Sequence, residues 1–252
     1  MPTGGRAIRG SIARDPYRGS AAADTLEFVL TLRDHRPLLI AHRAGNELSR
    51  AHAALTAGAD LLEADVWMYR GRLEVRHEKT IRGVPLLWDR WRLMPAFGPR
   101  LLLDDMLGAL DPGTGLMLDL KGNDSRLAAA VDAVLRRYPR TGVVAVCSQN
   151  WRHVDAFAGR PDIAAVHSIG GARRLRRVLA SGRRFDAISL NARLLTPDLV
   201  HAVRERAALV MSWHVRDAAA AARLIADGTG ALILDDLALI RQLRSSSRPP
   251  SA

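Results

Sequence analysis

From residue 38 onward, the sequence alternates short apolar runs with stretches that have the periodicity of amphipathic helices. This alternation is typical of a parallel sheet covered by helices, because parallel strands need a crossover between them. The 252 residues match the length that one (β/α)₈ barrel uses. We therefore predict an α/β fold, a (β/α)₈ TIM barrel over residues 37–244. Its eight predicted strands are Leu38 to His42, Leu61 to Trp67, Leu116 to Lys121, Val143 to Ser148, Ile163 to Ser168, Ala187 to Asn191, Ala208 to Trp213 and Ala231 to Asp235.

Helix signals lie between these strands. Thr196 before Pro197 predicts an N-cap followed by proline at the first helical position, and Gly58, Gly182 and Gly228 predict helix ends. The predicted helices are Asn46 to Ala57, Asp124 to Tyr138, Trp151 to Ala158, Ala172 to Ala180, Pro197 to Arg206 and Asp217 to Ala226.

Three segments fall outside the repeat. Residues 71–115 form a long insertion between barrel strands 2 and 3, and insertions on the C-terminal side of a barrel usually help to build its site. Residues 1–36 are predicted to hold a loose tail and a helix, Asp24 to Leu32, that closes the bottom of the barrel. Residues 245–252 are predicted to be a disordered tail, because they are polar and rich in serine and proline.

The charge of the chain narrows the class of partner. The formal net charge is +11, which favours an anionic partner, but only two of the 37 basic residues are lysines and the arginines are spread along the chain. A nucleic-acid reader would gather its charge in one stripe, often with aromatic residues between. We therefore expect no specific nucleic-acid partner, and we interpret the arginines of residues 173–184 as a solvated helix face.

The apolar content and the cysteine count indicate where the chain works. No apolar run approaches the roughly 18 residues of a transmembrane helix, and residues 1–23 lack the apolar core of a secretory signal. The single cysteine, Cys147, cannot form an internal disulfide, which favours a reducing and therefore cytoplasmic setting. Peripheral contact with a membrane surface and the oligomeric state are left open.

Acidic residues occupy two apolar strands at alternate positions. Side chains two residues apart share a face of a strand, so Glu63 lies beside Asp65 and Asp119 beside Lys121. Buried carboxylates need a cation or a charged partner, and the C-terminal ends of the strands are where barrel enzymes hold their sites. Three carboxylates suit one divalent cation, Mg²⁺ or Ca²⁺. The alternative is that these carboxylates pair with buried arginines.

Two histidines accompany these carboxylates. His42 closes the first strand and His77 ends an extended piece of the insertion. Two imidazoles on either side of a phosphate can divide general base and general acid catalysis, while Arg43 and Lys121 would hold the phosphate oxygens. His35, His52, His153, His167 and His201 are interpreted instead as packed, hydrogen-bonded side chains without a convergent polar neighbour.

The combined motifs resemble the glycerophosphodiester phosphodiesterase family. The resemblance covers residues 38–236, and its motifs follow one another in the family's order. The matching segments are Ala41-His42-Arg43, Gly58-Ala59-Asp60 before Glu63-Ala64-Asp65-Val66, Val75-Arg76-His77, Asp119-Leu120-Lys121, and Val210 to Asp217.

The resemblance implies a role for each matched residue. It makes His42 and His77 the catalytic pair and Arg43 and Lys121 phosphate binders, and it makes Trp213 a wall of the substrate pocket, although Trp213 could equally be barrel core. The metal ligands that it implies are Glu63, Asp65 and Asp119.

The sequence also departs from the family pattern. Ala44 stands where the family has glycine, and the loop that follows is cut down to Gly45-Asn46-Glu47. Glu78 replaces the aspartate after the second histidine, and Asp119 replaces a glutamate, which shortens the reach of that ligand by one methylene. The short His-x-x-x-Asn spacing and the Asp-x-Lys pair are also similar to the related sphingomyelinase D enzymes.

The predicted function is metal-dependent hydrolysis of a small-molecule or lipid phosphodiester, with glycerophosphodiesters cleaved to an alcohol and glycerol phosphate. A sphingomyelinase D or lysophospholipase D type of reaction with a cyclic phosphate product is an alternative. A second alternative is a non-catalytic barrel that binds anions or nucleic acid through its arginines. A serine or cysteine hydrolase has little support, because no Gly-x-Ser-x-Gly segment is present.

Overall fold

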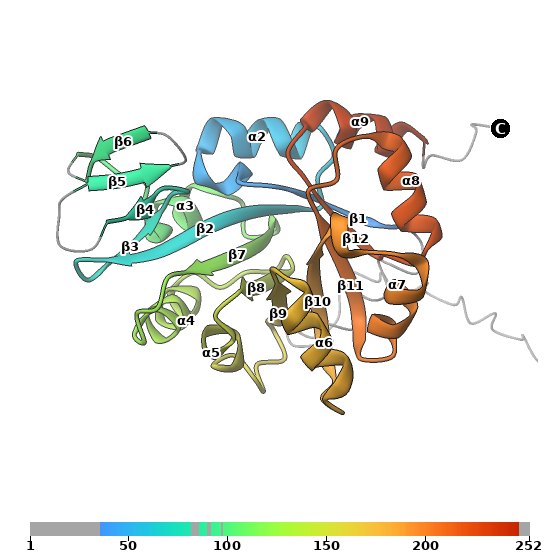
Figure 1. The fold of residues 1–252 in the computed structure, drawn as a ribbon. Coiled ribbons are helices and arrows are strands. Elements are labelled where there is room, and N and C mark those ends of the chain that lie inside the picture. Colours follow the sequence, from blue (N-terminus) through green and yellow to red (C-terminus); the bar gives the residue numbers. More distant parts are fainter. Residues whose placement is uncertain (1–35, 82–85, 90–91, 97, 247–252) are drawn as a thin grey trace, which may run out of the picture.

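The computed structural model describes residues 36–81, 86–89, 92–96 and 98–246. Within these residues, eight parallel strands form a closed barrel with helices outside it, which confirms the predicted (β/α)₈ fold (Figure 1). Each strand lies within two residues of its predicted bounds. The barrel strands are β1 (Leu38–Ala41), β2 (Leu61–Tyr69), β7 (Gly115–Lys121), β8 (Val144–Ser148), β9 (Ala164–Ile169), β10 (Phe185–Asn191), β11 (Ala207–Trp213) and β12 (Ala231–Leu234).

Strand β1 closes the barrel, because it pairs with β12 on one side and with β2 on the other. Ala41 is in register with Leu234, so the residues that follow these two strands emerge side by side at the C-terminal rim. On the other side of β2, Asp65 is in register with Asp119 of β7. Closure therefore brings the first, second, third and last barrel strands to one part of the rim.

The helices follow the predicted order. Thr196 caps α7 by accepting a hydrogen bond from the Leu199 N–H, with Pro197 in the first turn, as its sequence predicted. Helix α9 reaches Ser246, two residues into the segment predicted to be disordered. The helix bounds are α2 (Leu48–Thr56), α3 (Leu103–Ala109), α4 (Leu127–Arg137), α5 (Trp151–Asp155), α6 (Ala172–Ala180), α7 (Pro197–Arg204), α8 (Ala218–Ala226) and α9 (Leu237–Ser246), with 3₁₀ turns η1 (Ala44–Asn46) and η2 (Ala192–Leu194).

The insertion after β2 builds a second, smaller sheet. Strand β3 (Arg72–Val75) runs antiparallel to β2, and β4 (Lys79–Thr80), β5 (Leu86–Asp89) and β6 (Arg92–Pro95) form an antiparallel sheet beyond it (Figure 1). Helix α3 then returns the chain to β7. The sequence indicated only extended structure here, because these strands are too short to show a clear period.

The core has two layers that follow the alternation of side chains along the barrel strands. Leu62, Ala64 and Val66 of β2 belong to the apolar layer under the helices, whereas Leu61 belongs to a smaller cluster with Met117 inside the barrel. The period-two prediction for β2 and β7 is thereby confirmed. Glu63, Asp65 and Asp119 fall on the inner face above this small cluster.

The predicted Asp24 to Leu32 helix and the last six residues of the chain lie outside the described residues. No helix in the described part of the chain is long and apolar enough to cross a membrane.

Candidate active site

Three carboxylates meet inside the C-terminal rim of the barrel. Glu63 and Asp65 of β2 are fully buried, and Asp119 of β7 is half-buried. One oxygen from each carboxylate lies within 4.8 Å of the others. The aspartate at position 119, one methylene shorter than the family's glutamate, therefore still reaches the cluster.

Lysine, not arginine, is the nearest cation to these carboxylates. Lys121 Nζ lies 2.8 Å from Asp65 Oδ1 and also contacts Asp119. The Arg43 Nε is farther away, at 3.9 Å from Asp65 Oδ2. Two of the three carboxylates thus share one ammonium group, Glu63 forms no ion pair with a described lysine or arginine, and pairing with buried arginines does not account for the cluster.

This excess of negative charge shifts the pKa values of the cluster. Burial, and then the charge of Asp65, raise the pKa of Glu63 well above its usual range, and burial also raises the pKa of Asp119. Burial alone would raise the pKa of Asp65, but its hydrogen bond with His77 and the charge of Lys121 outweigh burial and lower it. Burial opposes the charge of Lys121, yet Asp119 and Asp65 raise its pKa.

His42 lies directly after β1 and is held by an aspartate from the far end of the chain. His42 Nδ1 is 2.5 Å from Oδ1 of Asp235, which directly follows β12. The other ring nitrogen, Nε2, lies 4.0 Å from Glu63 Oε2. Asp235 was not predicted to be a site residue, although it lies at the C-terminal end of a predicted strand.

His77 lies two residues after the end of β3 and faces the same cluster from the insertion. Its Nδ1 is 3.3 Å from Asp65 Oδ2, and its Nε2 is 3.3 Å from Asp89 Oδ1. Asp89 ends β5 of the small sheet. The carboxylate that contacts His77 Nε2 therefore comes from the inserted sheet, not from the neighbouring Glu78.

The shortened loop after His42 holds two of the carboxylates by hydrogen bonds. The Arg43 N–H donates to Glu63 Oε2 at 2.5 Å, with Arg43 in the left-handed region at φ 56°. Asn46 donates from Nδ2 to Asp65 Oδ2 at 2.9 Å and accepts the Asp65 N–H at 2.8 Å. Gly45 lets this loop approach β2, because a Cβ there would lie 2.7 Å from that of Ala64.

Trp213 ends β11 on the same rim. It is partly exposed, packs against the inner apolar cluster and stacks edge-on against His214, with ring centroids 4.6 Å apart. It therefore has one side in the barrel core and another open to the rim. No described contact joins it to Glu63, Asp65 or Asp119.

The five histidines predicted to be packed, hydrogen-bonded side chains agree with that prediction only in part. His153 and His167 are buried and hydrogen-bonded, whereas His52 and His201 are exposed, and His35 lies outside the described residues. The prediction that His167 lacks a convergent polar neighbour is wrong, because its Nε2 lies 2.9 Å from Asp155 and 3.1 Å from Arg183. Both partners come from loops or helices outside the strand, where strand period gives no signal.

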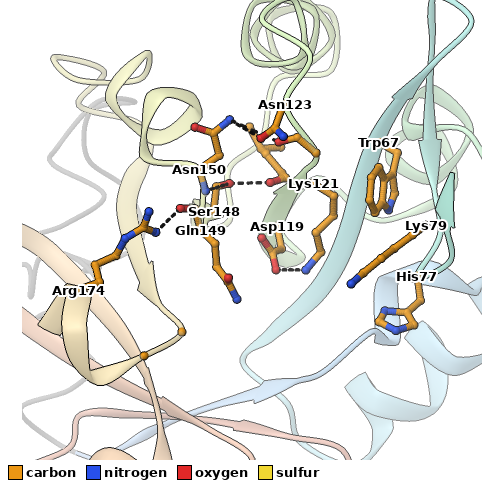
Figure 2. Close-up of a pocket in the computed structure, with 14 residues that line it drawn as sticks. Trp67, His77, Lys79, Asp119, Lys121, Asn123, Ser148, Gln149, Asn150 and Arg174 are labelled. Atoms are coloured by element: carbon orange, nitrogen blue, oxygen red, sulfur yellow. Dashed lines mark hydrogen bonds and ion pairs between the residues drawn. The ribbon is translucent and has the colours of Figure 1, made fainter. Parts of the chain in front are cut away.

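A cavity of about 740 Å³ opens beside Asp119 and Lys121. Its walls carry His77 and Lys79 on one side and Arg174 on the other, with Gln149 and further amide side chains between them (Figure 2). Cys147 of β8 is buried in the apolar cluster inside the barrel. The cavity thus adjoins the carboxylate cluster at Asp119.

The three carboxylates with two flanking histidines, at the C-terminal rim of a (β/α)₈ barrel, define the class of site to compare with known proteins. No protein-family model and no curated protein sequence matches the chain. Solved structures do match the chain and share its fold.

These solved structures are glycerophosphodiester phosphodiesterases and related phosphodiesterases. The chain is similar to an Oleispira antarctica phosphodiesterase in complex with the product sn-glycerol-3-phosphate (TM-score 0.66, 18% identity, 83% of this chain and 96% of that one). It is also similar to a glycerophosphodiester phosphodiesterase from Thermotoga maritima (TM-score 0.64, 16% identity, 83% of this chain and 99% of that one). A third similar structure is a glycerophosphodiester phosphodiesterase from Parabacteroides distasonis (TM-score 0.64, 20% identity, 84% of this chain and 98% of that one). At these identities the comparison confirms the fold that the motif resemblance implied.

Proposed function

We propose that this protein hydrolyses phosphodiesters, with glycerophosphodiesters as the substrate class, to an alcohol and glycerol phosphate. The observation that carries the proposal is the convergence of Glu63, Asp65 and Asp119 with His42 and His77 on one part of the rim. Two imidazoles beside an acidic cluster suit the transfer of two protons around a phosphate. The solved structures with the same fold support this reaction class.

The two histidines divide the proton transfers. One imidazole accepts the proton of the attacking water, the P–O bond to the leaving alcohol breaks, and the other imidazole donates its proton to that alcohol. Asp235 fixes the His42 ring through Nδ1 and leaves Nε2 directed at the site. The hydrogen bond with His42 lowers the pKa of Asp235, so this aspartate stays ionised and can hold the ring through its Nδ1.

The carboxylate cluster fits one divalent cation. Its donors are all oxygens, as Mg²⁺ and Ca²⁺ prefer, and they hold more negative charge than Lys121 neutralises. Glu63, Asp65 and Asp119 would hold the cation, which would supply positive charge against the phosphoryl oxygens. Arg43 and Lys121 would bind the remaining phosphate oxygens, and Trp213 would form a wall for the glycerol.

The first experiment compares His42→Gln and His77→Gln with His201→Gln, an exposed histidine of α7 that serves as the matched control. Hydrolysis of glycerophosphocholine is measured with Mg²⁺, with Ca²⁺ and with chelator. We expect each site variant to lose about 10²- to 10⁴-fold in kcat with an unchanged Tm, and the control to keep its rate. Chelator should abolish turnover.

The same assay separates the alternatives. A near-normal rate in either site variant would contradict the assignment of the pair. A cyclic phosphate in the ³¹P NMR spectrum of the products would show that a hydroxyl of the substrate, not water, attacks. Binding to unrelated DNA with a steep salt dependence, without any diesterase activity, would favour the non-catalytic barrel.

A further inference from the structure

The cavity beside Asp119 extends well past the three carboxylates. It follows the C-terminal ends of β7, β8 and β9 as far as the start of α6, and its volume of about 740 Å³ is in the range of small-molecule sites. A phosphate held at the rim by Lys121 and His77 would fill only one end of this space. The other end is available for the group esterified to that phosphate.

Two cations without acidic partners stand on opposite walls of the cavity (Figure 2). Lys79 Nζ lies 5.8 Å from the centre of the Trp88 ring, and neither Lys79 nor Arg174 forms an ion pair with any described residue. Arg174 donates from Nη1 to the Gln149 carbonyl oxygen at 2.5 Å and lies over the Trp151 ring at 5.1 Å. These contacts position the guanidinium group but give it no acidic partner among the described residues.

Amide side chains cover the floor between the two cations. Asn123 and Asn150 are joined by a weak hydrogen bond of 3.4 Å, and no described residue hydrogen-bonds to the side chain of Gln149. This amide points into the cavity (Figure 2). Gly170 gives it room, because a Cβ at that position would lie 3.1 Å from Gln149 Oε1. Amides with free donors and acceptors are suited to bind hydroxyl groups.

We propose that this cavity binds a hydroxylated head group that carries a second negative charge, a phosphate or a carboxylate, next to the scissile phosphodiester. This inference rests on the proposed function and names its preferred substrates. Lys79 and Arg174 pair with the second charge, and the amides bind the hydroxyls. A choline head group is disfavoured, since quaternary ammonium groups bind in aromatic cages and here would face two cations.

The test uses three diesters that differ at one end only: glycerophosphoglycerol, the same diester with a terminal phosphate, and its counterpart ending in a carboxylate. Glycerophosphocholine is the fourth substrate. Selectivity is the kcat/KM of each charged diester divided by that of glycerophosphoglycerol. The variants are Lys79→Gln, Arg174→Gln and Arg174→Lys, with Arg173→Gln as the control. Arg173 is exposed on the same helix but does not line the cavity.

We expect the unmodified protein to favour at least one charged diester by about tenfold or more, and each glutamine variant to lose about tenfold of that selectivity. Arg174→Lys should keep most of the selectivity, and Arg173→Gln all of it. If the glutamine variants lose selectivity for the phosphate-ended diester, the second charge is a phosphate; if they lose it for the carboxylate-ended diester, the second charge is a carboxylate. Selectivity that is unchanged in both glutamine variants, or a preference for glycerophosphocholine, overturns the inference.

Failure of the proposed function gives a different result. Calorimetric Kd values for the same diesters are measured on the same variants, whether or not turnover occurs. The binding ratio is the Kd of glycerophosphoglycerol divided by the Kd of the charged diester. Absence of turnover together with a binding ratio that falls in Lys79→Gln and Arg174→Gln would reject the hydrolysis and keep the subsite. Turnover with a binding ratio that is unchanged in both glutamine variants would keep the hydrolysis and reject the subsite.

Discussion

Asp60 lies directly before barrel strand β2 and Asp65 lies within it, closer to the C-terminal rim, and the two carboxylates have opposite electrostatic surroundings. Asp60, just before β2, pairs with two guanidinium groups, at 2.8 Å from Arg36 Nη2 and in direct contact with Arg244, and it accepts the Leu39 N–H at 2.8 Å. Asp65 shares the Lys121 ammonium group with Asp119, and the third carboxylate, Glu63, forms no ion pair with a described lysine or arginine. The single carboxylate at the N-terminal, lower end is thus fully compensated by two guanidinium groups, whereas the cluster at the C-terminal, upper end keeps an excess of negative charge.

This difference separates a structural carboxylate from a candidate catalytic one. Residues at the N-terminal face of a (β/α)₈ barrel contribute to stability, and those at the C-terminal face to chemistry. A carboxylate with two arginine partners is fully satisfied and has no affinity left for a ligand. A buried cluster with excess negative charge costs stability, and such a cost is typical of functional sites.

Of the substitutions that remove one of these two carboxylates, the one at Asp65 should have the larger effect on activity. Asp65→Asn removes a proposed metal ligand and the carboxylate that contacts both His77 and Lys121. We expect a loss of at least about 10²-fold in kcat and weaker dependence on the divalent cation, measured by initial rates over a titration of Mg²⁺ and of Ca²⁺. A normal metal titration in this variant would place the cation elsewhere.

The matching change at the lower end should act on stability instead. Asp60→Ala leaves Arg36 and Arg244 beside each other without their shared carboxylate, and the Leu39 N–H without its acceptor. We expect a loss of about 2 to 3 kcal/mol in the free energy of unfolding, measured in urea, because the site is only partly buried. The kcat of the folded fraction should stay normal. A fall in kcat comparable to that of Asp65→Asn would show that the two ends are not independent.

The carboxylates of the upper cluster were more predictable from the sequence than the groups that surround them. Period-two alternation places Glu63, Asp65 and Asp119 on one face, and short apolar runs identify every barrel strand. The carboxylates that contact the two histidines could not be found this way. Asp235 reaches His42 only because the barrel closes with Ala41 in register with Leu234.

The insertion was the least predictable part of the site. Asp89 contacts His77 from a four-residue strand, which is too short for a period to show. Lys79 and Arg174 line one cavity although 95 positions separate them, and their approach depends on the shape of the closed barrel. Interpreting the arginines of residues 173–184 as a solvated face fits the exposed positions of α6 but omits the contribution of Arg174 to the cavity.

Neutralising one acid of the upper cluster should stabilise the protein in the absence of metal. Glu63 has its pKa raised in the folded chain, so its favourable contribution is present at low pH and is lost as the pH rises through that raised value. Glu63→Gln replaces the carboxylate with an uncharged amide, which removes the destabilisation that ionised Glu63 causes at neutral pH. The amide oxygen still accepts the Arg43 N–H. We expect a gain of about 1 kcal/mol at neutral pH with chelator and a flatter decline of Tm with rising pH. A lower Tm at neutral pH would contradict the assigned excess of charge.

The smallest effect is expected from removing one of the two arginines at the lower end. Arg36 is about one-third exposed, and Asp60 keeps Arg244 and the Leu39 N–H when Arg36 is lost. Arg36→Gln should therefore cost only about 0.5 kcal/mol in urea unfolding and leave the metal titration of activity unchanged, because an exposed ion pair is screened by water. A cost close to that of Asp60→Ala would mean that Arg36 alone neutralises the carboxylate. The lower end would then hold one ion pair, not a redundant set, and the contrast with the upper cluster would rest on fewer groups.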